Sequence, residues 1–315
     1  MPAPPERTAV VLANPAARRA IAPRVLHAAA EAMRARGWRV LIETAGSAGD
    51  TRMRAEQHAR SGVDALLACG GDGTLLAVVN GVRAAGASNP PAVGIIPAGT
   101  ANVWAAEARV PRDHDRALGL VETGPRRLVD VGLARIGDGP PVRFLLVCGA
   151  GLDAAAVETV DAHPAWKSRL GRFAYGAAGL ATLATLAPVD AVIRADGDEV
   201  HVRRLLFALA ANTHRYGGVV ALTRRHALDD GRFEVTTFEG GAILRRLGLA
   251  VQALRGRLDE RTVRGVTHRA AGTLTITPSR PLPVQVDGDS MGQCGPDAPL
   301  SVEVEHRALT MIFGR

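Results

Sequence analysis

The 315-residue chain has few aromatic residues and few cysteines, and each shortage excludes a class of protein. Aromatic residues make up only 3% of the chain, which argues against a nucleic-acid binder that stacks bases on rings. Cys69, Cys148 and Cys294 lie far apart and have no metal-binding spacing. Cys69 and Cys148 end apolar runs, so we expect buried free thiols and a reducing cytoplasm.

Long apolar runs and an export signal are also missing. The N-terminal MPAPPERTAV has no apolar core after a basic start, so secretion is not expected. The uncharged run Phe173–Val189 is shorter than the roughly 20 residues that span a bilayer, and it contains glycine and proline. We therefore expect a cytoplasmic protein without a transmembrane helix.

The chain is basic, with 38 basic and 31 acidic residues and a net charge of +7. Lys167 is the single lysine, and the abundance of arginine, alanine and glycine fits a bias in genome base composition. A functional interpretation is attraction to phosphate, a lipid headgroup or nucleic acid. Hydrophobic residues at 47% and charged residues at 22% are typical of a folded protein and exclude a disordered chain.

Apolar strands alternate with helical stretches up to about residue 128. This rhythm predicts a parallel sheet covered by helices. We expect the asparagine-proline turn at Asn14 to open a helix that ends near Gly37. The other expected elements are strands at Thr8–Ala13, Trp38–Thr44, Val63–Cys69 and Ala92–Ile96 and helices at Asp50–Arg60 and Leu75–Ala85.

From Val129 onward strands and turns dominate, which predicts a second, mainly antiparallel β domain. We place the boundary near Asp130, giving domains 1–129 and 130–305. Helical stretches interrupt this half at Pro164–Ala187 and Ala242–Leu254. The expected strands are Val129–Ile136, Arg143–Cys148, Ala191–Ala195, His201–Ala210, Arg232–Phe238, Gly272–Pro278 and Leu282–Val286.

The sharpest motif is Gly70-Gly71-Asp72-Gly73-Thr74, between a strand and a helix and followed by Leu75 and Leu76. Glycines let the backbone approach a ligand, and successive N–H groups at a helix start bind anions. An aspartate beside phosphate makes sense when both share a magnesium ion. The loop lacks the Gly-Lys-Ser/Thr of a Walker A motif. The alternative interpretation is a tight turn without a ligand.

Polar or glycine-rich turns follow the other strands of this half as well. Asn14 follows the first strand, Thr44 ends the second, and Gly99, Thr100 and Asn102 follow the fourth. Ligands of open α/β sheets bind beyond the carboxyl ends of the strands. Together these turns predict a nucleotide site.

At these residues the sequence resembles the diacylglycerol kinase catalytic-domain family, which includes bacterial soluble lipid kinases, sphingosine kinases and ceramide kinases. The resemblance covers nearly the whole chain, and the order of the motifs separates it from NAD kinases and phosphofructokinases. The matching segments are Asn14–Arg18, Gly70–Leu75, Pro97–Asn102, Val129–Gly132, Cys148–Val157, Ala227–Val235 and Gln285–Asp289.

The resemblance implies a Rossmann-like ATP-binding domain, similar to those of phosphofructokinases and NAD kinases, and a β-sandwich that holds lipid. It places the active site in the cleft between them. It also implies that the tail, about 306–315, returns to the first domain with Ala308–Phe313 as a strand. The expected activity is ATP- and magnesium-dependent phosphorylation of a lipid hydroxyl. A non-catalytic nucleotide-binding protein and an NAD kinase stay as alternatives.

The resemblance also implies roles for individual residues. The Gly70–Leu76 loop would hold the ATP phosphates, and Asp72 with Asp130 would hold the catalytic magnesium. The proton acceptor for the lipid hydroxyl would be Asp287 or Asp289. The family normally has glutamate at the second of these positions, so the shorter Asp289 leaves the choice open.

A second, non-catalytic magnesium in bacterial relatives corresponds to Asp230 with the carbonyls of Ala227 and Arg232. This chain departs from the family pattern there, because Arg225 and Arg232 replace uncharged residues and would repel a cation. A plain turn without metal is the alternative.

On the lipid side, Pro164–Ala187 would line an acyl-chain pocket or fill the core. Arginines would place the protein at an anionic membrane surface, or form a solvated face. Nucleic acid is not expected as a partner, and a homodimer stays open. The arginines are Arg245, Arg246, Arg255, Arg257, Arg261 and Arg264.

Overall fold

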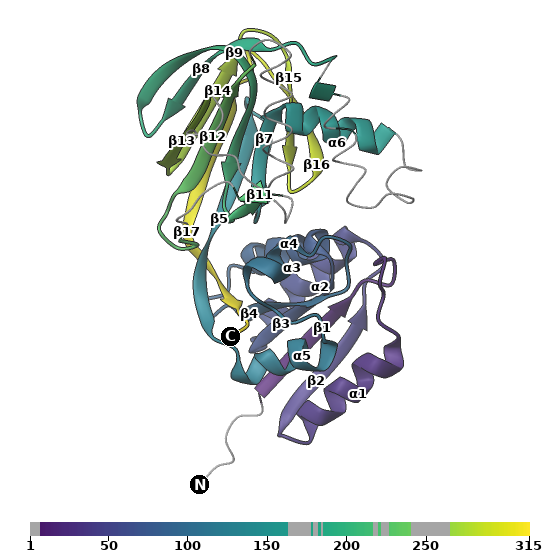
Figure 1. Ribbon diagram of the computed structural model, residues 1–315. Coiled ribbons are helices and arrows are strands. Elements are labelled where there is room, and N and C mark those ends of the chain that lie inside the picture. Colours follow the sequence, from purple (N-terminus) through teal and green to yellow (C-terminus); the bar gives the residue numbers. More distant parts are fainter. Residues whose placement is uncertain are drawn as a thin grey trace. The chain divides into compact units, whose positions relative to one another are not determined.

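The chain divides into two compact units, each of which is described by itself (Figure 1). The first consists of Met1–Val129 with Arg307–Arg315, and the second of Asp130–His306. The computed structural model describes residues 7–162, 178, 182–183, 185–216, 220–221, 227–240 and 265–315.

The first unit is a parallel sheet with helices on both faces, as the alternating sequence predicts. The strands lie in the order β4-β3-β1-β2, and every neighbouring pair is parallel. Helices α1 and α5 pack together on one face, and α2 and α3 on the other (Figure 1). The elements are β1 (Arg7–Ala13), α1 (Pro23–Arg34), β2 (Trp38–Thr44), α2 (Ala48–Arg60), β3 (Ala65–Gly70), α3 (Asp72–Ala85), β4 (Ala92–Pro97), α4 (Val103–Glu107) and α5 (His114–Thr123).

Helix α1 begins at Pro23, so the expectation that the turn at Asn14 opens a helix is wrong. The side chain of Asn14 accepts the Ala16 N–H at 2.9 Å and closes a local turn instead. The Arg19 N–H donates to the Ala98 carbonyl at 3.1 Å, which ties this segment to the end of β4. Proline suits the first turn of a helix because it lacks the N–H that would have no partner there.

The second unit is an antiparallel β-sandwich that carries one described helix of several turns, α6. Strand β9 joins its two sheets, because its carboxyl half lies between β7 and β12 while its amino half pairs with β8. The elements are β5 (Arg126–Ile136), β6 (Val142–Phe144), β7 (Val147–Gly151), α6 (Leu152–Ala162), β8 (Val189–Ala195), β9 (Asp198–Ala211), β10 (Arg215–Tyr216), β11 (Val220–Ala221), β12 (Phe233–Glu239), β13 (Val266–Ala271), β14 (Thr273–Pro278), β15 (Leu282–Val286), β16 (Asp289–Cys294) and β17 (Leu300–Ile312).

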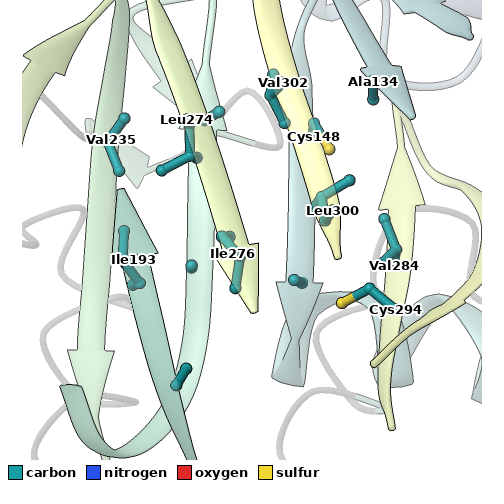
Figure 2. Close-up of a cluster of buried hydrophobic side chains, with 14 of the residues drawn as sticks. Ala134, Cys148, Ile193, Val235, Leu274, Ile276, Val284, Cys294, Leu300 and Val302 are labelled. Atoms are coloured by element: carbon teal, nitrogen blue, oxygen red, sulfur yellow. The ribbon is translucent and has the colours of Figure 1, made fainter. Parts of the chain in front are cut away.

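Buried aliphatic side chains from several strands fill the interior of this unit (Figure 2). Along β14, Leu274 and Ile276 are buried while the residues between them are partly exposed, which is the alternation of a strand with one face on the core. Val284 and Leu300 contribute from β15 and β17. Removal of these side chains from water supplies the main stabilisation of the sandwich.

One expected strand of the second half is wrong, and one helix was not predicted. The strand expected over Arg143–Cys148 is split into β6 and β7, because the N–H groups of Leu145 and Leu146 donate to the carboxylate of Asp287 rather than to a neighbouring strand. Helix α6 was not predicted. Most of the helix expected at Pro164–Ala187, and all of that expected at Ala242–Leu254, lies outside the described residues. No helix in the described part of the chain is long and apolar enough to cross a membrane.

Strand β17 leaves the second unit and ends in the first. Met311 pairs in parallel with Val93 of β4, and the Gly314 N–H donates to the Ala108 carbonyl at 2.7 Å. The ring of Phe313 meets the buried ring of Trp104 edge-on, with 6.2 Å between centroids. The last residues are therefore part of the core of the first unit.

Candidate functional site

Two glycine-rich loops lie in backbone contact at the carboxyl edge of the first sheet. The carbonyl of Gly70 accepts the N–H groups of Ala98 and Gly99 at 2.8 and 3.1 Å. A Cβ on Gly99 would lie 2.5 Å from the Cα of Gly71, so a side chain there would force the loops apart. Glycine is required at this position because two main chains meet there.

The register of the strands brings the predicted nucleotide-binding residues to this same edge. Ala13 pairs with both Thr44 and Cys69, so β1, β2 and β3 end side by side. The side-chain amide of Asn14 donates to Oγ1 of Thr74 at 3.2 Å. Thr44 and Thr100 are exposed at the edge. The structure thus gathers these residues around the start of α3.

Gly73 lies in the first turn of α3, is exposed, and has open space where a side chain would be. Packing against other protein atoms therefore does not explain why this residue is glycine. The first N–H groups of a helix have no partners within that helix, and they attract anions. The open side of this turn therefore presents a helix N-terminus of the kind that attracts anions.

Asp72 has a structural role that the sequence analysis missed. Its two carboxylate oxygens accept the N–H groups of Val103 and Trp104, each at 3.0 Å, so it caps helix α4. Burial raises the pKa of Asp72, and these main-chain hydrogen bonds oppose the rise. Asp72 and Val103 are 31 residues apart in the chain, so no local sequence pattern predicts this cap.

Asn102 fixes the second glycine loop. It adopts a left-handed conformation with φ of 51°, and its side chain accepts the Gly99 N–H and donates to the Gly99 carbonyl, both at 3.0 Å. Asparagine tolerates this conformation better than most residues because its side chain hydrogen-bonds locally. The side chain predicted to line the nucleotide site therefore also shapes the loop.

In the second unit, the two carboxyl groups of the Asp287-Gly288-Asp289 turn have different surroundings. The carboxylate of Asp287 accepts three main-chain N–H groups, from Leu145 at 2.8 Å and from the next two residues at 2.9 Å. Asp289 is exposed and begins β16. Asp287 thus anchors the turn, while Asp289 faces solvent.

A mostly buried carboxyl group, Asp153, lies beside this turn. Burial raises the pKa of Asp153 to about 7, and a hydrogen bond from the side-chain amide of Gln285 opposes the rise. Asp153 belongs to the Cys148–Val157 segment, but its burial depends on β15 and β7, which are distant from one another in the chain, so local spacing does not predict it.

Asp130, the first residue of the second unit, is completely buried. One carboxylate oxygen lies 3.0 Å from Nδ1 of His306, and the other accepts the Gly231 N–H at 2.7 Å. Its main-chain N–H donates to the Leu228 carbonyl at 2.7 Å. Asp130 therefore holds the turn at residues 228–231, and its pairing with Asp72 on a magnesium stays a prediction.

The predicted second metal site is an exposed turn. Oδ1 of Asp230 accepts the Arg232 N–H at 3.1 Å, and Ala227 is exposed as well. The guanidinium of Arg232 is directed to Asp196, 3.7 Å away. Among the described residues no group of three or more His, Cys, Asp or Glu is placed to hold a metal ion. A site built largely from carbonyls stays a prediction. Arg225 and the arginines predicted to face the membrane lie outside the described residues.

The pKa of Asp153 leads to a pH dependence of stability. An aspartate whose pKa is raised on folding is tolerated at low pH, and it destabilises the protein as pH rises through its folded pKa. Asp153→Asn removes this titration. The unfolding free energy of the variant minus that of wild type is expected to increase by roughly 1–3 kcal/mol as pH rises from 5 to 8.5. Denaturant unfolding of both proteins at the two pH values measures this difference. The same difference at both pH values would contradict the prediction.

Comparisons with known proteins agree with the geometry. A family model described as the diacylglycerol kinase catalytic domain matches residues 8–134, and one described as the YegS C-terminal NAD kinase beta sandwich-like domain matches residues 146–313. The diacylglycerol kinase of Bacillus subtilis (strain 168) is 28% identical over 287 residues, 91% of each chain. That of Staphylococcus aureus (strain JH9) is 31% identical over 245 residues, 78% of this chain and 74% of the relative.

Solved structures share the fold. A diacylglycerol kinase from Bacillus anthracis aligns with a TM-score of 0.69 at 20% identity, over 98% of this chain and 97% of that chain. A yeast NADH kinase complexed with NADH aligns with a TM-score of 0.52 at 12% identity, over 98% and 84%. The match of both family models, in order along one chain with an α/β unit and a β-sandwich, places the protein in the diacylglycerol kinase catalytic-domain family.

Proposed function

We propose that this protein is an ATP- and magnesium-dependent kinase that transfers the γ-phosphoryl group of ATP to a hydroxyl group of a lipid. The observation that carries the proposal is the open first turn of α3 at Gly73, at the edge where the two glycine loops meet. Membership of the diacylglycerol kinase catalytic-domain family supports the lipid as acceptor.

Phosphoryl transfer depends on positioning and on neutralising charge more than on covalent chemistry. In the first unit, the N–H groups that begin α3 would hold the phosphates, with Thr74 positioned by the amide of Asn14. Thr44 and Thr100 would contact the rest of the nucleotide from the ends of β2 and β4. The close approach of Gly71 and Gly99 places the two glycine loops next to each other at this surface.

The donor chemistry of Asp72 fits magnesium, which prefers carboxylate oxygen and shares its coordination with substrate phosphates. The main-chain hydrogen bonds from Val103 and Trp104 hold the Asp72 carboxylate in place at the start of α3. Asp72 would therefore be the residue of the first unit that holds the ion. Bound magnesium supplies neutralisation of the charge on the transferring phosphoryl group.

The proton of the lipid hydroxyl needs an acceptor in the transition state. Asp289 suits this role better than Asp287, because Asp289 is exposed while the carboxylate of Asp287 accepts three main-chain N–H groups. Hydrogen bonds to a carboxylate favour its ionised form and weaken it as a base. We therefore assign the proton acceptor to Asp289 and the anchoring of the turn to Asp287.

The substrate class would be a neutral or amphiphilic lipid with a free hydroxyl, such as a diacylglycerol, a sphingoid base or a ceramide. Such a lipid resides in a membrane, so the protein would work at its surface. The net charge of +7 supports contact with anionic headgroups.

A panel of lipids tests the function directly. Wild-type protein with ATP and magnesium is expected to phosphorylate at least one of diacylglycerol, monoacylglycerol, sphingosine, ceramide and phosphatidylglycerol in mixed micelles, measured by transfer of labelled phosphate. ATP binding without transfer to any lipid would favour a non-catalytic nucleotide-binding protein. Phosphorylation of NAD would favour an NAD kinase.

Two glycine variants separate ligand binding from folding. Gly73→Ala places a methyl group in open space, so we expect unchanged stability and magnesium-ATP binding weakened by about tenfold or more. Gly99→Ala is expected to lower stability by about 1–3 kcal/mol because its methyl group meets Gly71. Calorimetric titration and thermal unfolding measure these effects. If Gly73→Ala binds ATP as tightly as wild type does, the assignment of the phosphates to the first turn of α3 is wrong.

Two aspartate variants test the proton acceptor. Asp289→Asn keeps the size of an exposed side chain, so we expect a stable protein with unchanged ATP binding and kcat lowered by about 10²–10⁴-fold. Asp287→Asn turns an NH₂ group toward the main-chain N–H groups it faces, so this variant is expected to lose stability. An Asp289→Asn enzyme with kcat within twofold of wild type would refute the assignment.

A further inference from the structure

Asp153 forms a hydrogen-bonded chain in the second unit with Gln285, which is 132 residues away in the sequence, and with Gly288. Asp153 lies in the first turn of α6, Gln285 in β15, and Gly288 between β15 and β16. The Nε2 of Gln285 donates to Oδ2 of Asp153, and its Oε1 accepts the Gly288 N–H at 2.8 Å. Gln285 is only 1% exposed, so water does not take the place of either partner.

The Gly288 N–H decides how the amide of Gln285 is oriented. A main-chain N–H only donates, so the carbonyl oxygen of Gln285 must face it. The NH₂ group then faces Asp153, and a buried NH₂ group requires an acceptor. Asp153 supplies that acceptor, so the hydrogen bond to Gly288 depends on a residue that does not touch Gly288.

The backbone around this chain makes room for it. Gly149 of β7 is the register partner of Gln285. A Cβ on Gly149 would overlap Oδ2 of Asp153 and would lie 2.9 Å from Nε2 of Gln285. The absence of a side chain at Gly149 is therefore what lets Asp153 reach across β7 to the amide.

The turn is thus held at two successive residues. Asp287, with φ of 49°, is fixed by three main-chain N–H groups, and Gly288, with φ of 91°, is fixed through Gln285. Asp289 follows directly and begins β16 opposite Val286. Because the turn determines where the Asp289 carboxylate lies, a loose Gly288 would displace it, and displacement of a reacting group by about 1 Å is costly to catalysis.

We propose that Asp153 is a positioning residue that acts through Gln285 to hold the Gly288 N–H, and so places the carboxylate of Asp289 for proton acceptance. The inference rests on the proposed function, because it takes Asp289 as the proton acceptor. It assigns to Asp153 no contact with ATP or with the lipid hydroxyl.

The first test compares Asp153→Leu, which keeps the volume but removes the acceptor, with Asp153→Asn, which keeps an acceptor oxygen. We expect kcat of Asp153→Leu to fall by at least about tenfold with KM for ATP unchanged, and kcat of Asp153→Asn to stay within about threefold of wild type. Asp198→Leu is the matched control, because Asp198 is 76% exposed and pairs with Arg269. Thermal unfolding confirms that each variant is folded at the assay temperature.

The second test reverses the polarity of the pair. Gln285→Glu keeps an oxygen for the Gly288 N–H but turns a second oxygen toward Asp153, so kcat is expected to fall. Adding Asp153→Asn places an NH₂ group opposite that oxygen and is expected to restore kcat to within about threefold of wild type. A double-mutant cycle on kcat measures this coupling.

Hydrogen exchange of the Gly288 amide tests the positioning without relying on activity. We expect faster exchange in Asp153→Leu and in Gln285→Glu, and slower exchange again in the double variant. Unchanged exchange together with unchanged kcat in Asp153→Leu would overturn the proposal. An effect confined to KM for the lipid would also overturn it, because Asp153 would then be a substrate contact. A wild-type protein that phosphorylates none of the lipids refutes the proposed function, while the exchange measurement still decides whether Asp153 holds Gly288.

Discussion

Buried peptide N–H groups must find an acceptor, and in this protein two carboxylates from distant segments meet that requirement where no strand or helix can. Asp72 accepts the N–H groups at the start of α4, and Asp287 accepts those between β6 and β7. Such charge-assisted bonds are stronger than those between neutral groups. Each carboxylate also belongs to a loop of the candidate site, so the same interactions that complete the backbone fix the residues available for chemistry.

Two residues of these loops adopt left-handed backbone conformations that side chains disfavour. Asn102 and Asp287 have φ of 51° and 49°. Each such residue costs on the order of 1 kcal/mol, and both are held by hydrogen bonds of their own side chains. The strain is therefore offset locally by these hydrogen bonds.

Much of the fold could be predicted from the sequence. Apolar strands alternating with helices predicted the parallel sheet, and its register explains why the turns at Asn14, Thr44 and Gly70 meet. The start of α1 was not predicted, because the side chain of Asn14 closes a local turn whose sequence resembles the start of a helix. The roles of Asp72 and Asp153 could not be predicted for a different reason. Each role depends on partners that are distant in the chain, and local sequence spacing does not indicate those partners.

Strand β17 makes the order of synthesis matter. The first unit needs Met311 beside Val93, the ring of Phe313 against Trp104, and the Gly314 N–H on Ala108, yet about 180 residues separate this strand from Val129. On the ribosome, most of the first unit emerges first but remains without a sheet strand and part of its core until residues 307–314 have left the exit tunnel. The whole second unit, which lies between these segments in the sequence, must therefore be synthesised before the first unit can be completed.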